Sequence, residues 1–268
     1  LSRGFWPALV ESWRRSVERA LGQGAAGRRL CVGLVGALDS PEDADQLRAH
    51  ARAAGLALPR ASLTTGRLED LTAGDGTVGL GGRRIDVLFR YYPLDWLAGP
   101  RWAPVLDAAA RGSIALLPDA QALIPQSKAF LALLWELEGQ GFFPPAEAAA
   151  VTRYVACTSL GPERFGRRPY VVKPYLEREG LGVRFSGEIA PRELGRLVKG
   201  PVVCQEQVEV TRARVPVATG RGWRREARHL IFGVFLAGSD VAGIYTRAGS
   251  RITGREAVYV PALLRRLP

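Results

Sequence analysis

The order of apolar and polar runs between residues 29 and 63 limits the folds open to this chain. Residues 29–35 form a short apolar run that predicts a buried strand. Residues 39–42, Asp-Ser-Pro-Glu, then predict the start of a helix that runs to about Ala54, with proline in its first turn. A second strand is predicted near residues 60–63. A strand, a helix and a strand in this order indicate a parallel, right-handed α/β unit.

The chain around this unit alternates in the same way. A preceding amphipathic helix is predicted at residues 5–21, because apolar side chains recur there at helical spacing. After the unit we expect a β-hairpin with strands at 77–80 and 83–90, a short helix at 102–111 and a buried strand at 113–117.

The second half of the sequence is richer in strands. A helix is predicted at residues 127–137 and is ended by the segment 141–145. Apolar runs bounded by turn residues then predict strands at 169–174, 182–186, 201–208, 229–236 and 241–246. The last two strands are expected to form a hairpin.

Composition sets further limits. The chain has 268 residues, 47% hydrophobic and 24% charged, which is typical of one large or two medium globular domains. No apolar run is long enough to span a membrane. The three cysteines, Cys31, Cys157 and Cys204, are odd in number and widely spaced. A disulfide framework or zinc site is therefore not expected, and the cysteines fit a reducing cytoplasm.

The net charge of +11 permits nucleic-acid binding, but arginines are spread along the whole chain. One dense stretch carries six arginines with Trp223 among them: Arg212, Arg214, Arg221, Arg224, Arg225 and Arg228. With Gly220 and Gly222 it is predicted as a hairpin or surface loop. It can be a solvated basic loop, a nucleic-acid site, or a surface that attracts polyphosphate or an acidic substrate. The first interpretation is favoured, and nucleic acid is not expected as the partner.

Lysine is rare in this chain. Only Lys128, Lys173 and Lys199 are lysine, so the other 34 of the 37 basic residues (37 − 3) are arginine. Lysine carries a compact charge on a slim stem, whereas arginine is a broad planar fork, so a retained lysine can mark a site that arginine cannot fill. All three can equally be ordinary surface residues.

The context of two lysines favours an anion site. Lys173 lies in the apolar run 170–174, which is followed by the glycine-containing loop 177–182. Lys128 is predicted to begin a helix. A buried ammonium group needs an anion, and phosphate is a common one.

The order of these pieces resembles the ATP-grasp fold, in which two small α+β lobes hold ATP between them. Lys128 comes first, and Lys173 with its glycine loop follows. A strand with a polar end, 202–208, and a hairpin that ends at Arg247 complete the order.

Short motifs resemble one branch more closely, the glutathionylspermidine synthase family. The similar segments run from about residue 85 to 263 and are Tyr91–Trp96, Pro125–Ala129 with Leu134–Leu137, Tyr170–Pro174 with Arg178–Gly180, and Ala242–Ile244 with Arg247 and Ile252–Thr253. Together they resemble the "LYPWEW", "NKA…LLWEL", "YVVKP…REG" and "AGI..R….IT" patterns of that family.

The resemblance implies a nucleotide site. Lys128 and Lys173 would reach the phosphates of ATP, and the loop with Gly180 would close over them. Arg178 would add a donor, and Arg247 would contact the γ-phosphate or an acyl phosphate. The strand 203–208 would lie under the adenine, with Gln205, Glu206, Gln207 and Val208 as its contacts.

The resemblance also implies the reaction. A small-molecule or peptide carboxylate would attack the γ-phosphate, and an amine would displace phosphate from the acyl phosphate to form an amide, with Mg²⁺ on the phosphates. The acidic, asparagine-containing segment that supplies metal ligands in the family has no counterpart here, and the chain contains no Asn. The metal ligands are therefore unassigned. Either the part that carries them precedes this sequence, which leaves the region 1–118 incomplete at its start and is the favoured interpretation, or metal-dependent catalysis is lost.

We therefore predict an α/β (α+β) protein with a Rossmann-like pre-ATP-grasp region at 1–118 and an ATP-grasp region at 119–268. The predicted function is an ATP-dependent carboxylate–amine ligase without an amidase domain. A non-catalytic ATP-binding module that has lost its metal site, and a basic nucleic-acid-binding protein, are the alternatives.

Overall fold

Strand β1 (Cys31–Gly36) is central to the first sheet of this computed structural model, which describes residues 2–219, 222–238 and 240–260. It pairs in parallel with β2 (Ser62–Arg67) on one side and β6 (Val87–Tyr91) on the other, and β7 (Ala115–Leu117) adds to β6. The chain divides into two units, residues 1–123 with 234–243 and residues 124–233 with 244–268.

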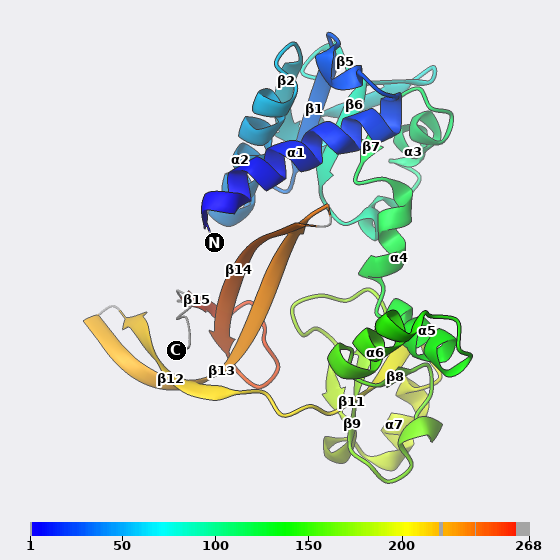
Figure 1. The fold of residues 1–268 in the computed structure, drawn as a ribbon, viewed down its shortest axis with the longest axis vertical. Coiled ribbons are helices and arrows are strands. Elements are labelled where there is room, and N and C mark those ends of the chain that lie inside the picture. Colours follow the sequence, from blue (N-terminus) through cyan, green and yellow to red (C-terminus); the bar gives the residue numbers. More distant parts are fainter. Residues whose placement is uncertain (1, 220–221, 239, 261–268) are drawn as a thin grey trace. The chain divides into compact units, whose positions relative to one another are not determined.

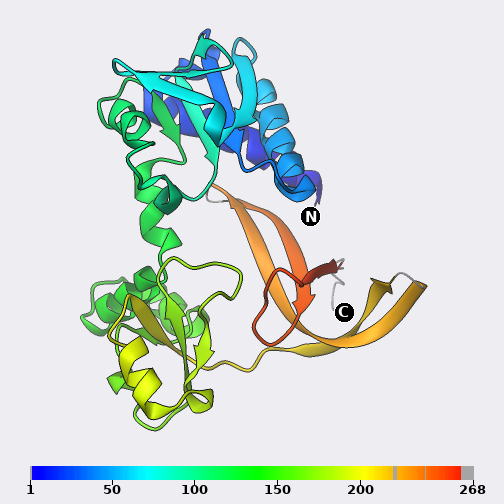
Figure 2. The same cartoon turned by 180° about the vertical axis from the view of Figure 1, so that it is seen from behind.

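Both faces of this parallel sheet are covered by helices. Helices α1 (Ser2–Leu21) and α2 (Pro41–Ala57) lie over one face, and α3 (Ala103–Ala110) lies over the other (Figures 1 and 2). Residues that alternate along the strands enter two separate apolar clusters. Leu34 packs with Trp13 and Val17 of α1, whereas Val35 packs with Val105 of α3. The near-continuous apolar strands are therefore those of a sheet that is buried on both faces.

The predicted α/β unit is confirmed. Ser40 caps α2 by accepting a hydrogen bond of 3.0 Å from the Asp43 amide, and Pro41 occupies the first turn. The predicted second strand near residues 60–63 is β2, which begins two residues later, at Ser62. The helices predicted at 5–21 and 102–111 correspond to α1 and α3.

The hairpin predicted at 77–90 is shorter than expected. Strand β4 (Thr77–Leu80) pairs with β3 (Leu71–Gly74) and with β5 (Arg83–Arg84). The chain then leaves the hairpin, because Ile85 is buried in the core and the Asp86 carboxylate accepts from the Cys31 amide at 2.8 Å. The apolar residues that follow form β6 of the parallel sheet.

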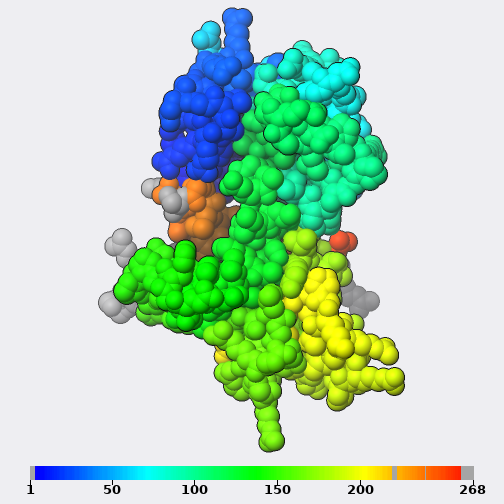
Figure 3. Space-filling view, turned by 90° about the vertical axis from the view of Figure 1, so that its right-hand side faces the viewer, coloured from blue at the N-terminus to red at the C-terminus, as the bar shows by residue number. Residues whose placement is uncertain are grey.

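The second unit contains a mixed layer of helices and antiparallel strands. Its helices are α5 (Ala129–Gly139), α6 (Pro145–Tyr154) and α7 (Pro191–Leu197), and the short α4 (Leu123–Gln126) precedes them. Its first sheet has the order β10 (Arg184–Phe185), β9 (Tyr170–Pro174), β11 (Val202–Glu206) and β8 (Thr158–Ser159). Helix α5 packs against β8 and β11. Figure 3 shows the space-filled surface of this part of the chain in green and yellow.

A second antiparallel sheet has the order β12 (Arg212–Thr219), β13 (Gly222–Ala237), β14 (Asp240–Gly249) and β15 (Val258–Val260). The predicted strand at 229–236 is the second half of β13, and the one at 241–246 lies within β14. Short 3-10 turns connect other elements and lie at Ala25–Gly27, Leu68–Asp70, Leu94–Leu97, Ala120–Ala122, Glu163–Phe165 and Ser186–Glu188.

The helix predicted at 127–137 is confirmed as α5, which begins two residues later, at Ala129. Two other predictions for the second unit need correction. The segment 141–145 ends one helix but also begins α6, since proline is favoured in a first helical turn. The strand predicted at 201–208 ends at Glu206, because its partner Tyr170 is the first residue of β9. Gln207 and Val208 therefore lie beyond the strand.

The basic stretch predicted as a hairpin or surface loop is part of two long strands, β12 and β13. Gly220 and Arg221 of that stretch lie outside the described residues. No helix among the described residues is long and apolar enough to span a membrane. The predicted class, a Rossmann-like α/β region followed by an ATP-grasp fold, is confirmed.

Candidate functional site

The two faces of strand β9 differ, because one is apolar and the other carries Lys173 next to the buried Val171. Tyr170 and Val172 point into a core with Cys204 of β11, and burial raises the pKa of the Cys204 thiol to about 11. Lys173 lies on the opposite face, because successive side chains of a strand alternate. The register places Lys173 beside Val203 and Val171 beside Gln205, so Lys173 and Gln205 share this face.

A chain of hydrogen bonds fixes the Lys173 side chain. Its Nζ donates to Gln205 Oε1 at 2.5 Å, and Gln205 Nε2 donates to Thr158 Oγ1 at 2.9 Å. Thr158 is buried and donates in turn to the Ala156 carbonyl at 2.7 Å. Each group of the chain has a defined donor or acceptor role, so the ammonium group is held in one position over the sheet.

Lys128 approaches the end of β9 from another element. It is the residue that caps α5, and its backbone N–H donates to the Tyr175 carbonyl at 2.9 Å. Its Nζ donates to the Glu177 carbonyl at 2.5 Å. Both contacts tie the start of α5 to the loop that follows Lys173.

The two lysines share an electrostatic environment. Burial lowers the pKa of Lys173, and the positive charge of Lys128 lowers this pKa further. Burial also lowers the pKa of Lys128, and the charge of Arg178 adds to this effect. Lys128 thus interacts electrostatically with both Lys173 and Arg178.

The partners of the two lysines are neutral. Among the described residues, no carboxylate forms an ion pair with Lys128 or Lys173, and their hydrogen-bond acceptors are a carbonyl and an amide oxygen. Half-buried cations without an ion-pair partner are unfavourable, and the charge of Glu177 only partly offsets the burial that lowers the pKa of Lys128. An added anion would remove this cost, so the arrangement is suited to bind an anion such as phosphate.

The glycine-containing loop after β9 has a left-handed backbone. Glu179 and Gly180 have φ values of 53° and 75°. A side chain at Gly180 would lie 2.6 Å from Ile252 Cγ2 and 3.1 Å from the Thr253 carbonyl oxygen. Gly180 is therefore required for close contact between this loop and residues 252–253.

Ion pairs join the same two segments. Arg255 pairs with Glu179, and Arg251 pairs with Glu188 at 2.7 Å while its guanidinium lies 3.6 Å from the centre of the Phe185 ring. A hollow of about 210 Å³ lies beside them and is lined by Val183, Arg184, Phe185, Glu188, Ile189, Glu193 and Ile252. Neither Lys128 nor Lys173 lines this hollow.

The other predicted contacts are dispersed. Arg247 donates from Nη2 to the Gly254 carbonyl at 3.0 Å and lies 5.9 Å from the centre of the Tyr259 ring. Its Nε is buried and has no hydrogen-bond partner among the described residues. The Glu206 carboxylate accepts from the backbone N–H of Cys157 at 3.3 Å. The backbone N–H of Gln207 donates to the Pro169 carbonyl at 3.4 Å. Val208 is exposed.

Two parts of this site were not predicted from the sequence. Thr158 orients Gln205, but no motif around it points to this role. Residues 251–255 contact the glycine loop, although only Ile252 and Thr253 were noted, as part of a motif. In the described part of the chain, no group of three His, Cys, Asp or Glu side chains could hold a metal ion.

The chain belongs to the glutathionylspermidine synthase pre-ATP-grasp family, because the model of that family matches residues 5–265. The resemblance inferred from the motifs is thus confirmed. Membership in this family indicates an ATP-grasp-type ligase. No curated protein sequence matches it.

Solved structures show the fold. A putative gamma-glutamylcysteine synthetase from Methylobacillus flagellatus KT is 11% identical, with a TM-score of 0.57 over 97% of this chain and 71% of that chain. The ATP-grasp ligase PsnB, complexed with a phosphomimetic variant of its minimal precursor, Mg and ADP, is 15% identical, with a TM-score of 0.41 over 85% of both chains. The first likeness shows a shared fold alone, and the second is too low to compare function.

Proposed function

We propose that this protein is an ATP-dependent ligase that joins a carboxylate to an amine through an acyl phosphate. The support comes from the cluster of Lys128, Lys173 and Arg178, which has no compensating carboxylate within ion-pair distance of the lysines. ATP would supply the phosphoryl group that activates the carboxylate. The region 1–118 would act as the pre-ATP-grasp part, and 119–268 would bind the nucleotide.

Each residue then has a defined task. Lys128 and Lys173 would bind phosphate oxygens as point charges, and Gln205 and Thr158 would hold Lys173 in place. The loop with Gly180 and Arg178 would cover the phosphates and exclude water. Glu206, Gln207 and Val208 would border the base, and Arg247 would contact the transferred phosphoryl group.

The described residues contain no group of three His, Cys, Asp or Glu side chains that could hold a metal ion. Mg²⁺ commonly binds through substrate phosphates, waters and one or two carboxylates, so the residues that would hold it are not assigned. We therefore derive no catalytic step through the metal. A nucleotide-binding module without ligase activity is the second candidate function, because this sequence has no counterpart of the metal-ligand segment of the family.

Thermal unfolding with and without ATP and Mg²⁺ tests nucleotide binding. A ligand at about 100 times its dissociation constant stabilises the folded state by about 2.7 kcal/mol. We expect ATP to raise the melting temperature of the wild type and not that of Lys173→Ala. Lys199→Ala is the matched control, because Lys199 is exposed. A loss of the ATP effect in both variants, or in neither, would contradict the proposed site.

Phosphate release distinguishes a ligase from a binding module. A ligase should release phosphate from ATP only when both a carboxylate and an amine substrate are added, and Lys173→Ala should abolish this release. A protein that binds ATP but releases no phosphate with any pair from a substrate library is the non-catalytic module.

A further inference from the structure

The ribbon formed by β12 and β13 has two chemically different faces. Its antiparallel register places Arg212 opposite His229, Arg214 opposite Ala227, Pro216 opposite Arg225 and Ala218 opposite Trp223. Residues directly opposite each other share a face of a sheet, and every second residue along a strand shares it as well. Arg212, Arg214, Trp223 and Arg225 therefore lie on one face, which we name the arginine face.

The other face is balanced in charge. It carries Arg224, Glu226 and Arg228, opposite Val217, Val215 and Ala213. Glu226 pairs with both arginines, and their hydrogen bonds lower the pKa of its carboxyl group. Val215 is buried on this side.

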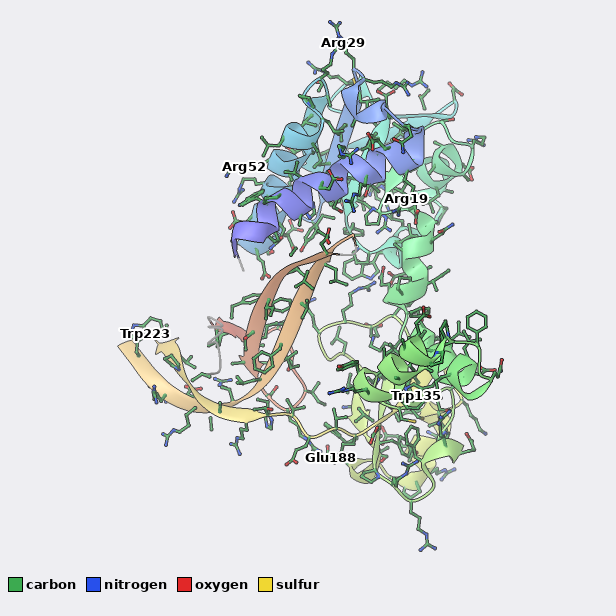
Figure 4. The ribbon with its side chains drawn as sticks, viewed as in Figure 1. Arg19, Arg29, Arg52, Trp135, Glu188 and Trp223 are labelled. Atoms are coloured by element: carbon green, nitrogen blue, oxygen red, sulfur yellow. The ribbon has the colours of Figure 1, made fainter. Side chains whose placement is uncertain are left out.

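The arginine face has no such balance. Arg212, Arg214 and Arg225 are exposed, and no carboxylate of the described chain pairs with any of them. Trp223 is 76% exposed and lies at the end of the ribbon, opposite the small side chain of Ala218 (Figure 4). Exposed arginine and tryptophan are the residue types that most often dominate binding energy at interfaces.

Strand β12 also offers a backbone edge. It is the outermost strand of its sheet, so one side of its backbone has no strand partner within that sheet. Pro216 lacks an amide hydrogen, so Arg212–Val215 is the stretch that can form a full ladder with an added strand. Charge and proline on an edge also prevent aggregation, but that purpose does not explain an exposed tryptophan.

We propose that β12 binds an acidic peptide, which adds to the sheet as an extended strand. Side chains of an added strand that lie on the arginine face would sit opposite Arg212 and Arg214, with the spacing of every second residue. A peptide with carboxylates at alternate positions satisfies both arginines, and Arg225 and Trp223 extend the contact. This binding surface goes beyond the proposed function, because none of its residues belongs to the site around Lys128 and Lys173.

A nucleic acid is the less suitable occupant. Its phosphates and bases could use the arginines and Trp223, but it has no amide groups to pair with the free edge of β12. The acidic peptide uses the arginines, the tryptophan and the edge together.

The experiment measures binding of a fluorescent peptide of alternating Glu and Thr to the full chain without ATP. A peptide of Glu-Glu-Thr-Thr repeats has the same composition but presents carboxylates on both faces, and an oligothymidylate of equal length tests nucleic acid. We expect the alternating peptide to bind about tenfold or more tightly than the other two. Two further peptides carry methyl groups on alternate backbone amides, one on each of the two possible sets. Binding should be lost for the set whose amides face β12 and kept for the other set.

Charge reversal locates the site. Arg212→Glu with Arg214→Glu should weaken binding of the alternating peptide by about tenfold or more, since repulsion replaces two charge pairs. Arg19→Glu with Arg29→Glu changes the net charge equally at exposed positions of the first unit, and should leave binding within about threefold. Unchanged melting temperatures show that both double variants fold.

Three results would overturn the proposal: equal binding of both peptides, tighter binding of the oligothymidylate, or equal loss in the two double variants. Because no ATP is present, none of these results bears on nucleotide binding. Conversely, a failure of the ATP-dependent thermal shift leaves the peptide test intact.

Discussion

The parallel sheet of the first unit and the β8–β11 sheet of the second unit differ in the side chains that their two faces carry. In the first sheet, adjacent residues such as Leu34 and Val35 are fully buried on opposite faces. In the second, β9 buries Val172 on one face and places Lys173 on the other.

We infer from this difference that the first sheet mainly stabilises the fold, whereas the second sheet carries residues that can bind a ligand. The first sheet contributes mainly apolar burial, and its buried Arg90 in β6 donates to the Tyr92 carbonyl at 2.6 Å. A sheet with cations on one face gives up part of that burial and accepts a desolvation cost, and this cost is recovered when an anion binds. The comparison predicts opposite responses to mutation in the two sheets.

The largest effect is expected in the parallel sheet. Leu34→Ala removes a fully buried side chain from β1 and should lower the free energy of unfolding by about 2–5 kcal/mol. Leu56→Ala is the control, since Leu56 is 62% exposed and should change it by less than about 0.5 kcal/mol. Urea unfolding measures both. Equal costs would show that this sheet is not the rigid core described above.

A pH effect of similar size is expected at His50. Burial lowers its pKa from 6.5 to about 4, and its Nδ1 accepts from Trp13 Nε1 at 3.3 Å. The folded state keeps His50 neutral while the unfolded state takes up a proton below its ordinary pKa. The contribution of His50 is therefore fully present above about pH 6.5 and is lost as the pH falls towards 4, by up to about 3 kcal/mol.

Urea unfolding at several pH values between 7 and 4 measures this slope. His50→Gln retains a hydrogen-bond acceptor for Trp13 but does not titrate. Between pH 7 and 4, the free energy of unfolding of this variant should therefore fall by up to about 3 kcal/mol less than that of the wild type. If wild type and variant lose stability in parallel, His50 is not the group responsible.

A smaller effect is expected at the loop beside Lys173. Gly180→Ala places a methyl group 2.6 Å from Ile252 at a φ of 75°, and should cost about 1–2 kcal/mol. Gly187→Ala is the matched control, because no atom lies within 4 Å of the added carbon. Hydrogen exchange of the loop amides should increase in the first variant alone. Equal exchange in both would disprove the close contact.

The smallest effect should have the opposite sign. Lys173→Met exchanges a half-buried cation for an apolar side chain of similar length, and the unliganded protein should be unchanged or more stable by up to about 1 kcal/mol. At the same time, the stabilisation by ATP should be lost. A clear destabilisation without ATP would mean that Lys173 serves the fold and not a ligand.

Local elements and candidate cations could be predicted without the structure. Hydrophobic spacing is a local property, so it identified α1, α2, β1 and β2, whereas the residues of β6 were predicted as part of a hairpin. The apolar run 170–174 singled out Lys173, and the order of short motifs indicated the family.

The contacts between distant segments could not be predicted from the sequence and are seen only in the folded chain. The link from Lys173 through Gln205 to Thr158 depends on the register of three strands, and no sequence pattern records that register. The same reason applies to Gly180 and Ile252, and to the two faces of the β12–β13 ribbon. A local pattern predicts which side chains of one strand share a face, whereas the pairing of strands determines which side chains of different strands are in contact.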